Sequence, residues 1–293
     1  MLLSMKKFFL FIVVLVLLIL LAPFWLGLIF RDSKPVDTSD LVITWESPKV
    51  NAYDSLIQLD ESNYLEILDK AAEADGYLEP GLEGELSWIT AVPTLTGFMD
   101  AIRASIAHAE ELVENGDEEA STLELDRTLR VVQMMDNAPG TLIQSIIVYS
   151  SKELIFEAIR DNGLDMDVSE YADIESGMIN AYKLEFMLAK DVIESVELGG
   201  LDIGEDFLWG GIGYYFHPNE TLAEFAEITR ENISIIQAGC DGKTEVSNPP
   251  YAPDFLFFTE NAFGKVLIEA LTPRALSDNE KICEMEILIN ELQ

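Results

Sequence analysis

The sequence predicts an all-α protein in which an N-terminal transmembrane helix precedes a multi-helix bundle or αα-hairpin domain. Three observations support this fold class. An uncharged run of 23 residues stands near the N-terminus. After it, apolar residues recur at helical spacing in one segment after another. Finally, we find no convincing alternation of apolar and polar residues and no Asn-Gly hairpin, so β-strands are not expected.

The uncharged run, residues 8–30, is long enough to cross a bilayer. At ~1.5 Å per residue it spans about 34 Å, against ~30 Å for the hydrocarbon core. Lys6 and Lys7 precede it and place the N-terminus in the cytoplasm. Arg31 and Lys34 follow the run and reduce the difference in positive charge between its two ends. We therefore expect a single-pass protein in the cytoplasmic membrane, with its C-terminal domain outside, either periplasmic or extracellular.

A cleaved signal peptide is the competing interpretation of this run. Such a peptide has an apolar region of only ~7–15 residues and a small-x-small cleavage site. Neither feature is present, so an uncleaved signal anchor is favoured. The expected organisation is a cytoplasmic tip and anchor over residues 1–30, a linker over 31–47 and an extracytoplasmic α-helical domain over 48–293.

The first half of the predicted domain contains short helices and then a hairpin. Residues 51–59 suit a short helix, and residues 62–74 continue it or form a second one. Apolar residues at helical spacing predict longer helices over 96–115 and 117–137, and the turn ENGD between them predicts an antiparallel αα-hairpin. This hairpin faintly resembles a tetratricopeptide repeat, but no clean second unit follows at the required period of ~34 residues.

The second half is also expected to be mostly helical. Thr141 and Gln144 have capping-box spacing, and Asn162-Gly163 is typical of a helix end. A wide apolar face suggests that the helix between them is central: Ile143, Ile146, Ile147, Leu154 and Ala158. Residues 169–198 suit one long helix. Further helices are expected from the capping patterns Thr221/Glu224 and Ser277/Glu280, with another apolar segment over 253–272.

The charge balance excludes one class of partner. The chain has 53 Asp and Glu against 18 Lys and Arg, and all of the acids lie after residue 30. Residues 31–293 carry 16 of the bases, so their formal charge is 16 − 53 = −37. Such a surface repels nucleic-acid backbones and anionic lipids. The charge suits a solubilising surface better than a specific site for cations or basic partners.

Motifs that would reveal a reaction or a cofactor are missing from the sequence. It contains no G-x-S-x-G, HExxH, CxxC or Walker motif. The two histidines and two isolated cysteines cannot form a four-ligand zinc site from spaced pairs. Asp165, Asp167 and Glu170 match an EF-hand loop poorly. No catalytic, metal-binding or cofactor-binding residue is therefore predicted, and no cofactor is expected.

The stretch FLWGGIGYYFHPNETL, residues 207–222, is the most unusual in the chain. It combines five aromatic residues, three glycines and one of the two histidines. The favoured interpretation is structural: buried aromatic area and a backbone that bends at glycine. The second is an apolar pocket or partner-binding surface formed by Trp209, Tyr214, Tyr215, Phe216 and His217. Catalysis by His217 is the third.

The two cysteines, Cys240 and Cys283, are expected to form a disulfide. If residues 31–293 lie outside the cytoplasm, both cysteines are in an oxidising compartment, where pairing is favoured. The bond would connect the final helix to the preceding section. Two separate buried thiols are the alternative.

Three short motifs resemble a set of uncharacterised bacterial proteins. They are N-A-Y-D at residues 51–54, Y-x-F-x-P-N-x-T-L at 214–222 and N-A-F-G-K-V-L at 261–267. These bacterial proteins have one N-terminal membrane helix and an α-helical extracytoplasmic domain. The resemblance implies the same topology and a shared helical fold, and it implies no activity.

Three classes of function therefore remain open. The first is an anchored protein that binds or scaffolds, with the bilayer contacted through residues 8–30 and a protein partner in the cell envelope. The second is an anchored hydrolase whose site lies near His217. The third is a tetratricopeptide-like peptide binder built on residues 97–137. A compact bundle without a deep polar pocket or a concave repeat surface would favour the first class.

Overall fold

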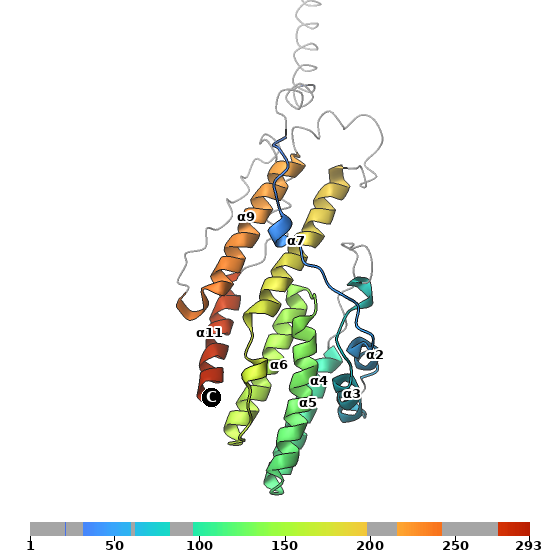
Figure 1. The fold of residues 1–293 in the computed structure, drawn as a ribbon, viewed down its shortest axis with the longest axis vertical. Coiled ribbons are helices and arrows are strands. Elements are labelled where there is room, and N and C mark those ends of the chain that lie inside the picture. The colour runs from blue at the N-terminus through green and yellow to red at the C-terminus, as the bar shows by residue number, and fades with distance from the viewer. Residues whose placement is uncertain (1–20, 22–31, 60–61, 83–95, 198–215, 242–274) are drawn as a thin grey trace, which may run out of the picture. The chain divides into compact units, whose positions relative to one another are not determined.

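In the computed structural model, the described part of the chain is helical. The described residues are 21, 32–59, 62–82, 96–197, 216–241 and 275–293, and they form no β-strand, which confirms the predicted all-α class (Figure 1). The α-helices are α2 (Ala52–Leu56), α3 (Tyr64–Ala72), α4 (Thr96–Glu114), α5 (Glu118–Asn137), α6 (Leu142–Asp161), α7 (Glu175–Glu197), α9 (Pro218–Gln237) and α11 (Ala275–Leu292).

Among these described residues, no helix is both long and apolar enough to cross a membrane. The span predicted at residues 8–30 lies outside them except for Leu21, and the apolar segment expected over 253–272 also lies outside. The anchor therefore stays a prediction.

Two compact units divide the chain. The first combines Met1–Thr38, Val192–Ile228 and Ser247–Thr272, and the second combines Ser39–Asp191, Thr229–Val246 and Pro273–Gln293. The second unit contains α2 to α6, most of α7, the C-terminal part of α9, and α11.

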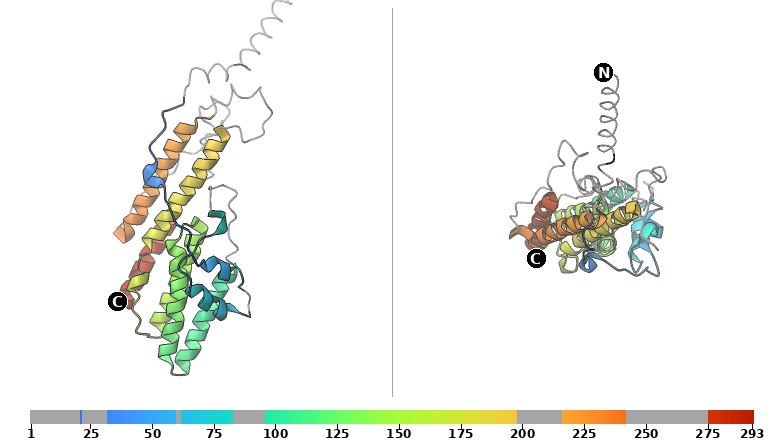
Figure 2. Two further views of the ribbon diagram at one scale, coloured as in Figure 1. Left: turned by 45° about the vertical axis from the view of Figure 1, so that its right-hand side comes forward. Right: turned by 90° about the horizontal axis from the view of Figure 1, so that it is seen from above.

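The second unit is built around α4, α5 and α6, which lie side by side (Figures 1 and 2). α4 and α5 form the predicted hairpin. Gly116 takes a positive φ of 81° in its turn, and the Asp117 side chain caps α5 by accepting a hydrogen bond from the Ala120 N–H at 3.1 Å. α6 contacts both helices of the hairpin and α11, which confirms its predicted central place. The result is a three-helix arrangement in which α6 packs against both arms of one hairpin.

The buried face of α6 differs from the prediction. Ile143 is 52% exposed, and of the five predicted residues only Ala158 is buried. The helix instead turns a mixed face inward, made of Gln144, Ser145, Val148, Tyr149, Ser151, Lys152, Ile155, Phe156, Ala158 and Ile159. Counting apolar residues alone selected the wrong face, because the polar side chains on the buried face find hydrogen-bond partners inside the protein.

The single helix predicted over residues 169–198 is also wrong at its start. The 3₁₀ turn η3 (Ser169–Tyr171) comes first, and α7 begins only at Glu175. The main-chain oxygens of Tyr171 and Asp173 accept hydrogen bonds from Lys152. The Asp173 carboxylate then caps α7 by accepting from the Ser176 N–H at 3.0 Å. These contacts interrupt the helix before Glu175.

Asn51 organises the start of the second unit. Its side chain caps α2 by accepting a hydrogen bond from the Tyr53 N–H, and it also exchanges hydrogen bonds with both main-chain groups of Leu78. Nearby, the Trp45 indole donates to the Leu82 carbonyl at 3.2 Å, and Leu41 is buried. The C-terminal part of the segment predicted as a linker, residues 31–47, is therefore packed into the second unit.

In the first unit, α9 starts earlier than predicted. Pro218 occupies its first position, where the missing N–H costs nothing. The predicted capping role of Thr221 is wrong: Thr221 lies inside the first turn, and its hydroxyl donates to the His217 carbonyl at 2.8 Å. The cap comes instead from Asp32, a residue far away in the sequence.

Candidate functional site

The structure describes two of the five residues predicted to line a pocket or partner surface. Trp209, Tyr214 and Tyr215 lie outside the described residues, whereas Phe216 and His217 are buried in the first unit. His217 is only 2% exposed, and its Nδ1 lies 2.8 Å from Oε2 of Glu220. This histidine–carboxylate contact is internal to the start of α9.

The other histidine, His108, belongs to a polar cluster between α4 and α5. Ser105 is fully buried and donates to Oε1 of Glu124 at 2.9 Å, and its hydroxyl lies 2.6 Å from that of Thr128. The Nδ1 of His108 lies 3.8 Å from the other Glu124 oxygen. The carboxylate therefore stands between the serine and the histidine. Because a serine nucleophile needs its base within hydrogen-bond reach, this cluster lacks the geometry of a catalytic triad.

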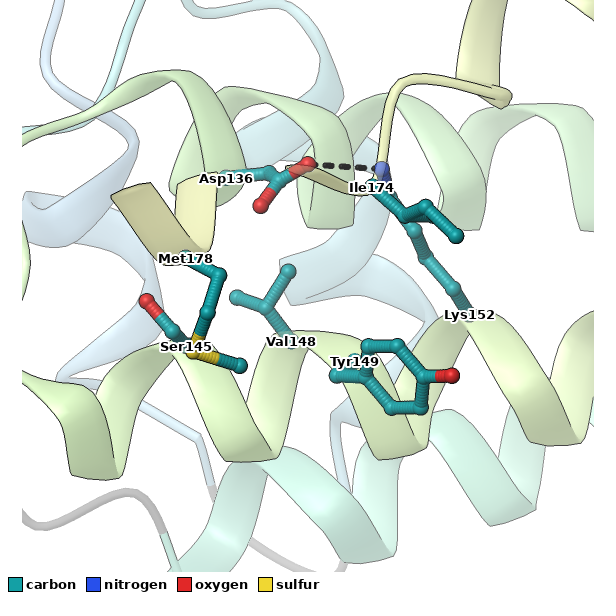
Figure 3. Close-up of a pocket in the computed structure, with 7 residues that line it drawn as sticks. All are labelled: Asp136, Ser145, Val148, Tyr149, Lys152, Ile174 and Met178. Atoms are coloured by element: carbon teal, nitrogen blue, oxygen red, sulfur yellow. Dashed lines mark hydrogen bonds and ion pairs between the residues drawn. The ribbon is translucent and has the colours of Figure 1, made fainter. Parts of the chain in front are cut away.

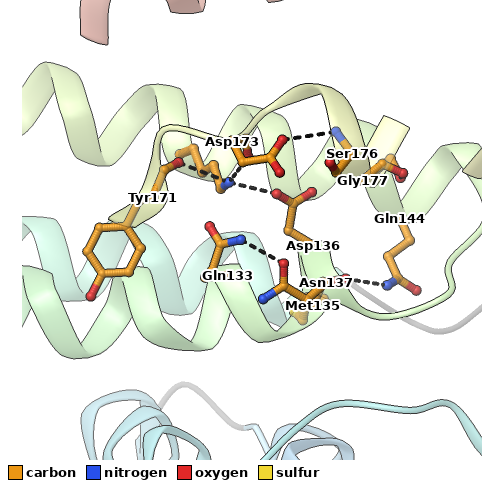
Figure 4. Close-up of polar contacts among 11 residues, drawn as sticks. Gln133, Met135, Asp136, Asn137, Gln144, Tyr171, Asp173, Ser176 and Gly177 are labelled. Carbon is orange, nitrogen blue, oxygen red and sulfur yellow. Dashed lines mark hydrogen bonds and ion pairs between the residues drawn. The ribbon is translucent and has the colours of Figure 1, made fainter. Parts of the chain in front are cut away.

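The most deeply buried charge in the described residues is Lys152 of α6, which is 1% exposed. Its ammonium group donates to Oδ2 of Asp136 at 2.7 Å, to the Asp173 carbonyl at 3.0 Å and to the Tyr171 carbonyl at 3.2 Å (Figure 4). An ammonium group has three N–H donors, and each one has an acceptor here. Lys152 thus connects α5, α6 and the segment that leads into α7.

Asp136, the partner of Lys152, lies in the last turn of α5 and against the first turn of α7. A Cβ atom at Gly177 would overlap the Asp136 carboxylate, so this close approach requires glycine. The positive end of the α7 dipole favours a negative charge at this place. Burial nevertheless raises the pKa of Asp136, while the charge of Lys152 acts in the opposite direction.

The amide side chain of Gln144, which Figure 4 shows, and the hydroxyl group of Ser145 complete the network around this ion pair. Gln144 donates to the main-chain oxygen of Met135 at 3.0 Å, which satisfies a carbonyl near the end of α5. Ser145 donates to the Gly177 carbonyl at 3.4 Å. The α5–α6 connection is therefore held to the start of α7 by polar contacts as well as by apolar packing.

A small cavity adjoins the ion pair (Figure 3). Its volume is about 10 Å³, and it is lined by Asp136, Ser145, Val148, Tyr149, Lys152, Ile174 and Met178. This volume is about the minimum that one water molecule needs and leaves no room for a substrate. All three N–H groups of the Lys152 ammonium group are also hydrogen-bonded, so Lys152 is not available as a nucleophile or base. The site suits a structural role instead, in which Lys152 holds α5, α6 and the segment before α7 together; we call this contact the Lys152 clamp.

The sequence contained a signal for this clamp. Lys152 stands at helical spacing among Val148, Ile155 and Ile159, so a charged residue lies within an otherwise apolar stripe. Its partners could not be found in the same way. Asp136 is one of many acids, and the Tyr171 and Asp173 acceptors are main-chain atoms whose direction depends on the fold.

The two cysteines are brought together as predicted. Cys240 lies in the 3₁₀ turn η4 (Gly239–Asp241) and Cys283 in α11, and their Sγ atoms are 2.11 Å apart with a Cα–Cα distance of 4.7 Å. The pair connects α11 to the turn that follows α9. Within the described residues, no group of three or more His, Cys, Asp or Glu side chains could hold a metal ion.

A further buried carboxyl, Glu79, predicts how stability depends on pH. It accepts a hydrogen bond from the Tyr77 hydroxyl at 3.1 Å, and burial raises its pKa from 4.5 to about 7. The folded state therefore binds this proton more tightly than the unfolded chain does. Ionisation of Glu79 costs no stability below about pH 4.5 and costs about 3 kcal/mol once the pH is well above 7.

Replacing this carboxyl by an amide, Glu79→Gln, should remove the penalty. We expect the free energy of unfolding at pH 8 to rise by up to about 3 kcal/mol relative to the unmodified chain, with little change at pH 4. Urea titrations at the two pH values measure this difference. Glu73→Gln, at an exposed position, is the control. Equal effects of the two substitutions at pH 8 would contradict the raised pKa of Glu79.

Comparison with known proteins assigns the chain to no family. No family model, curated protein or solved structure matches the chain. The resemblance to anchored bacterial proteins stays an expectation from three short motifs.

Proposed function

We propose that the chain is a single-pass membrane protein whose helical part lies outside the cytoplasm and acts by binding a protein partner in the cell envelope. The observation that carries this proposal is the pairing of Cys240 with Cys283, which leaves no cysteine free. Disulfides persist in oxidising compartments and are rare in the reducing cytosol. The pairing therefore supports an extracytoplasmic location for the second unit.

The N-terminal sequence supports the same topology. Residues 8–30 are uncharged and long enough to cross a bilayer, and Lys6 and Lys7 precede them. An anchor with basic residues on its N-terminal side keeps the N-terminus in the cytoplasm and places the residues after it outside.

The described polar clusters favour binding over catalysis. Lys152 and its acceptors form a closed network, Ser105 is inaccessible, and the cavity beside Lys152 has room for about one water molecule. The strong negative charge excludes nucleic acid as the partner.

Reporter fusions test the topology. Alkaline phosphatase attached after residue 293 should be active in a bacterial host, because this enzyme folds only after export. Deleting residues 8–30 from the same fusion should abolish the activity. An inactive phosphatase at residue 293, together with an active cytoplasmic reporter at the same place, would refute the proposed location.

A second arm of the experiment tests binding. Leu123, Ile143 and Ile287 are large apolar side chains of the second unit with 50–55% of their surface exposed. A photo-crosslinking residue placed at each position in intact cells should give an adduct of one defined mass at one or more of them. The exposed polar position Asn115 is the control. If none of the three apolar positions gives an adduct, the proposal that this unit binds a protein partner is contradicted.

A further inference from the structure

The residue that caps α9 lies directly after the predicted membrane span. The Asp32 carboxylate accepts hydrogen bonds from the Asn219 N–H at 2.8 Å and from the Glu220 N–H at 3.1 Å. The Ser33 N–H adds a bond of 2.7 Å to the same carboxylate. Asp32, Asn219 and Glu220 all belong to the first unit.

These contacts complete the start of the helix. Pro218 has no N–H, and the Thr221 N–H already bonds to the His217 carbonyl at 2.9 Å. Asn219 and Glu220 carry the remaining donors of the first turn, and both bond to Asp32. A carboxylate at this place also interacts favourably with the positive end of the helix dipole. The chain that leaves the predicted membrane span is therefore attached to α9 and is not a free tether.

Chain geometry limits how far the first turn of α9 can be from the bilayer. Asp32 follows Phe30, the last residue of the apolar run, by two positions, which span at most about 7 Å. The aspartate side chain and its hydrogen bond add about 5 Å. The Asn219 nitrogen is thus within about 12 Å of the end of the apolar run. The head-group layer on each side of a bilayer is itself about 5–8 Å thick.

We infer that the first turn of α9 lies against the lipid head groups of the membrane that holds the chain, and that Asp32 fixes it there. This inference rests on the proposed anchor. The partner surface that fits is a zwitterionic phospholipid layer. Its ammonium groups can face Glu220, whose side chain is 46% exposed, and its phosphates can face the exposed Lys34. Anionic head groups would be repelled by the carboxylates of this turn.

Fluorescence quenching in vesicles tests the placement. The full chain is reconstituted in phosphatidylcholine and phosphatidylethanolamine, with a thiol-reactive fluorophore at Asn219→Cys. Only the backbone N–H of this residue takes part in the contact with Asp32. Phosphatidylcholine with a nitroxide on its head group should reduce the emission at least twofold. The same label at the exposed position Glu227→Cys lies about 12 Å further along α9 and should be quenched less.

Substitution of the capping residue tests its role. Asp32→Ala should remove at least half of the quenching at position 219, because the first turn is then free to leave the surface. Ser33→Ala keeps the main-chain bond to Asp32 and should leave the quenching unchanged. Equal quenching at 219 and 227, or quenching at 219 that is insensitive to Asp32→Ala, would overturn the inference.

The failure of this inference can be distinguished from failure of the proposed anchor. If the anchor is wrong, the unsubstituted chain will not float with the vesicles and will be extracted by alkaline carbonate. If the anchor is right and the inference is wrong, the chain will float and resist extraction, yet the label at position 219 will not be quenched.

Discussion

Replacing Lys152 by alanine should lower the free energy of unfolding by about 3–5 kcal/mol. The substitution leaves Asp136 buried without its cation, and it also removes the donor to the Tyr171 and Asp173 carbonyls. An uncompensated buried charge and two unsatisfied acceptors are costly, because water cannot replace the lost partner in the interior. Urea denaturation of the full chain in detergent micelles, followed by circular dichroism, measures the change.

Two further variants separate the ion pair from ordinary loss of packing. Lys152→Met combined with Asp136→Asn keeps most of the buried volume and removes both charges, so it should recover a large part of the lost stability. Lys70→Ala breaks an exposed ion pair with Glu66, at 2.6 Å, and should cost less than about 1 kcal/mol. If Lys152→Ala costs no more than Lys70→Ala, Lys152 does not act as a clamp.

Removing the disulfide should destabilise the chain by about 4 kcal/mol. The bond between Cys240 and Cys283 closes a loop with a sequence separation of 43 residues. In the chain-entropy model, opening a loop of this length gives the unfolded state about 4 kcal/mol of additional conformational freedom. The double variant Cys240→Ser with Cys283→Ser, studied by urea denaturation in the same micelles, should show this loss.

Reduction of the unmodified chain provides the comparison for this variant. A reducing agent should lower the denaturation midpoint of the unmodified chain towards that of the double serine variant, and it should not shift the variant itself. Equal midpoints for the serine variant and the oxidised chain would contradict the prediction and would mean that the apolar packing of α11 is sufficient. Ile282, Met285, Leu288 and Ile289 are the buried residues that provide this packing.

Helix content and helix ends were predictable where the signal is local. The α4–α5 hairpin has its apolar residues, turn glycine and capping aspartate within one continuous segment, so residue spacing and turn chemistry were sufficient. The end of α6 at Asn162-Gly163 is another such case, since Gly163 takes a positive φ of 65°. The cysteine pair was also predictable, because the chain has only two cysteines.

Contacts between distant segments were not predictable, and they decided the rest. The start of α9 is capped by a residue 187 positions earlier, which no local capping pattern can indicate. The start of α7 depends on a lysine of another helix that binds two main-chain oxygens.

The all-α class, the αα-hairpin and the cysteine pairing could be read from local periodicity, from turn chemistry and from a choice of only two thiols. The buried face of α6 and the first residues of α7 and α9 depend instead on contacts between segments that are far apart in the chain. A buried polar group is stable only with its partner, as Lys152 is with Asp136. That partner is supplied by the fold and not by the neighbouring sequence.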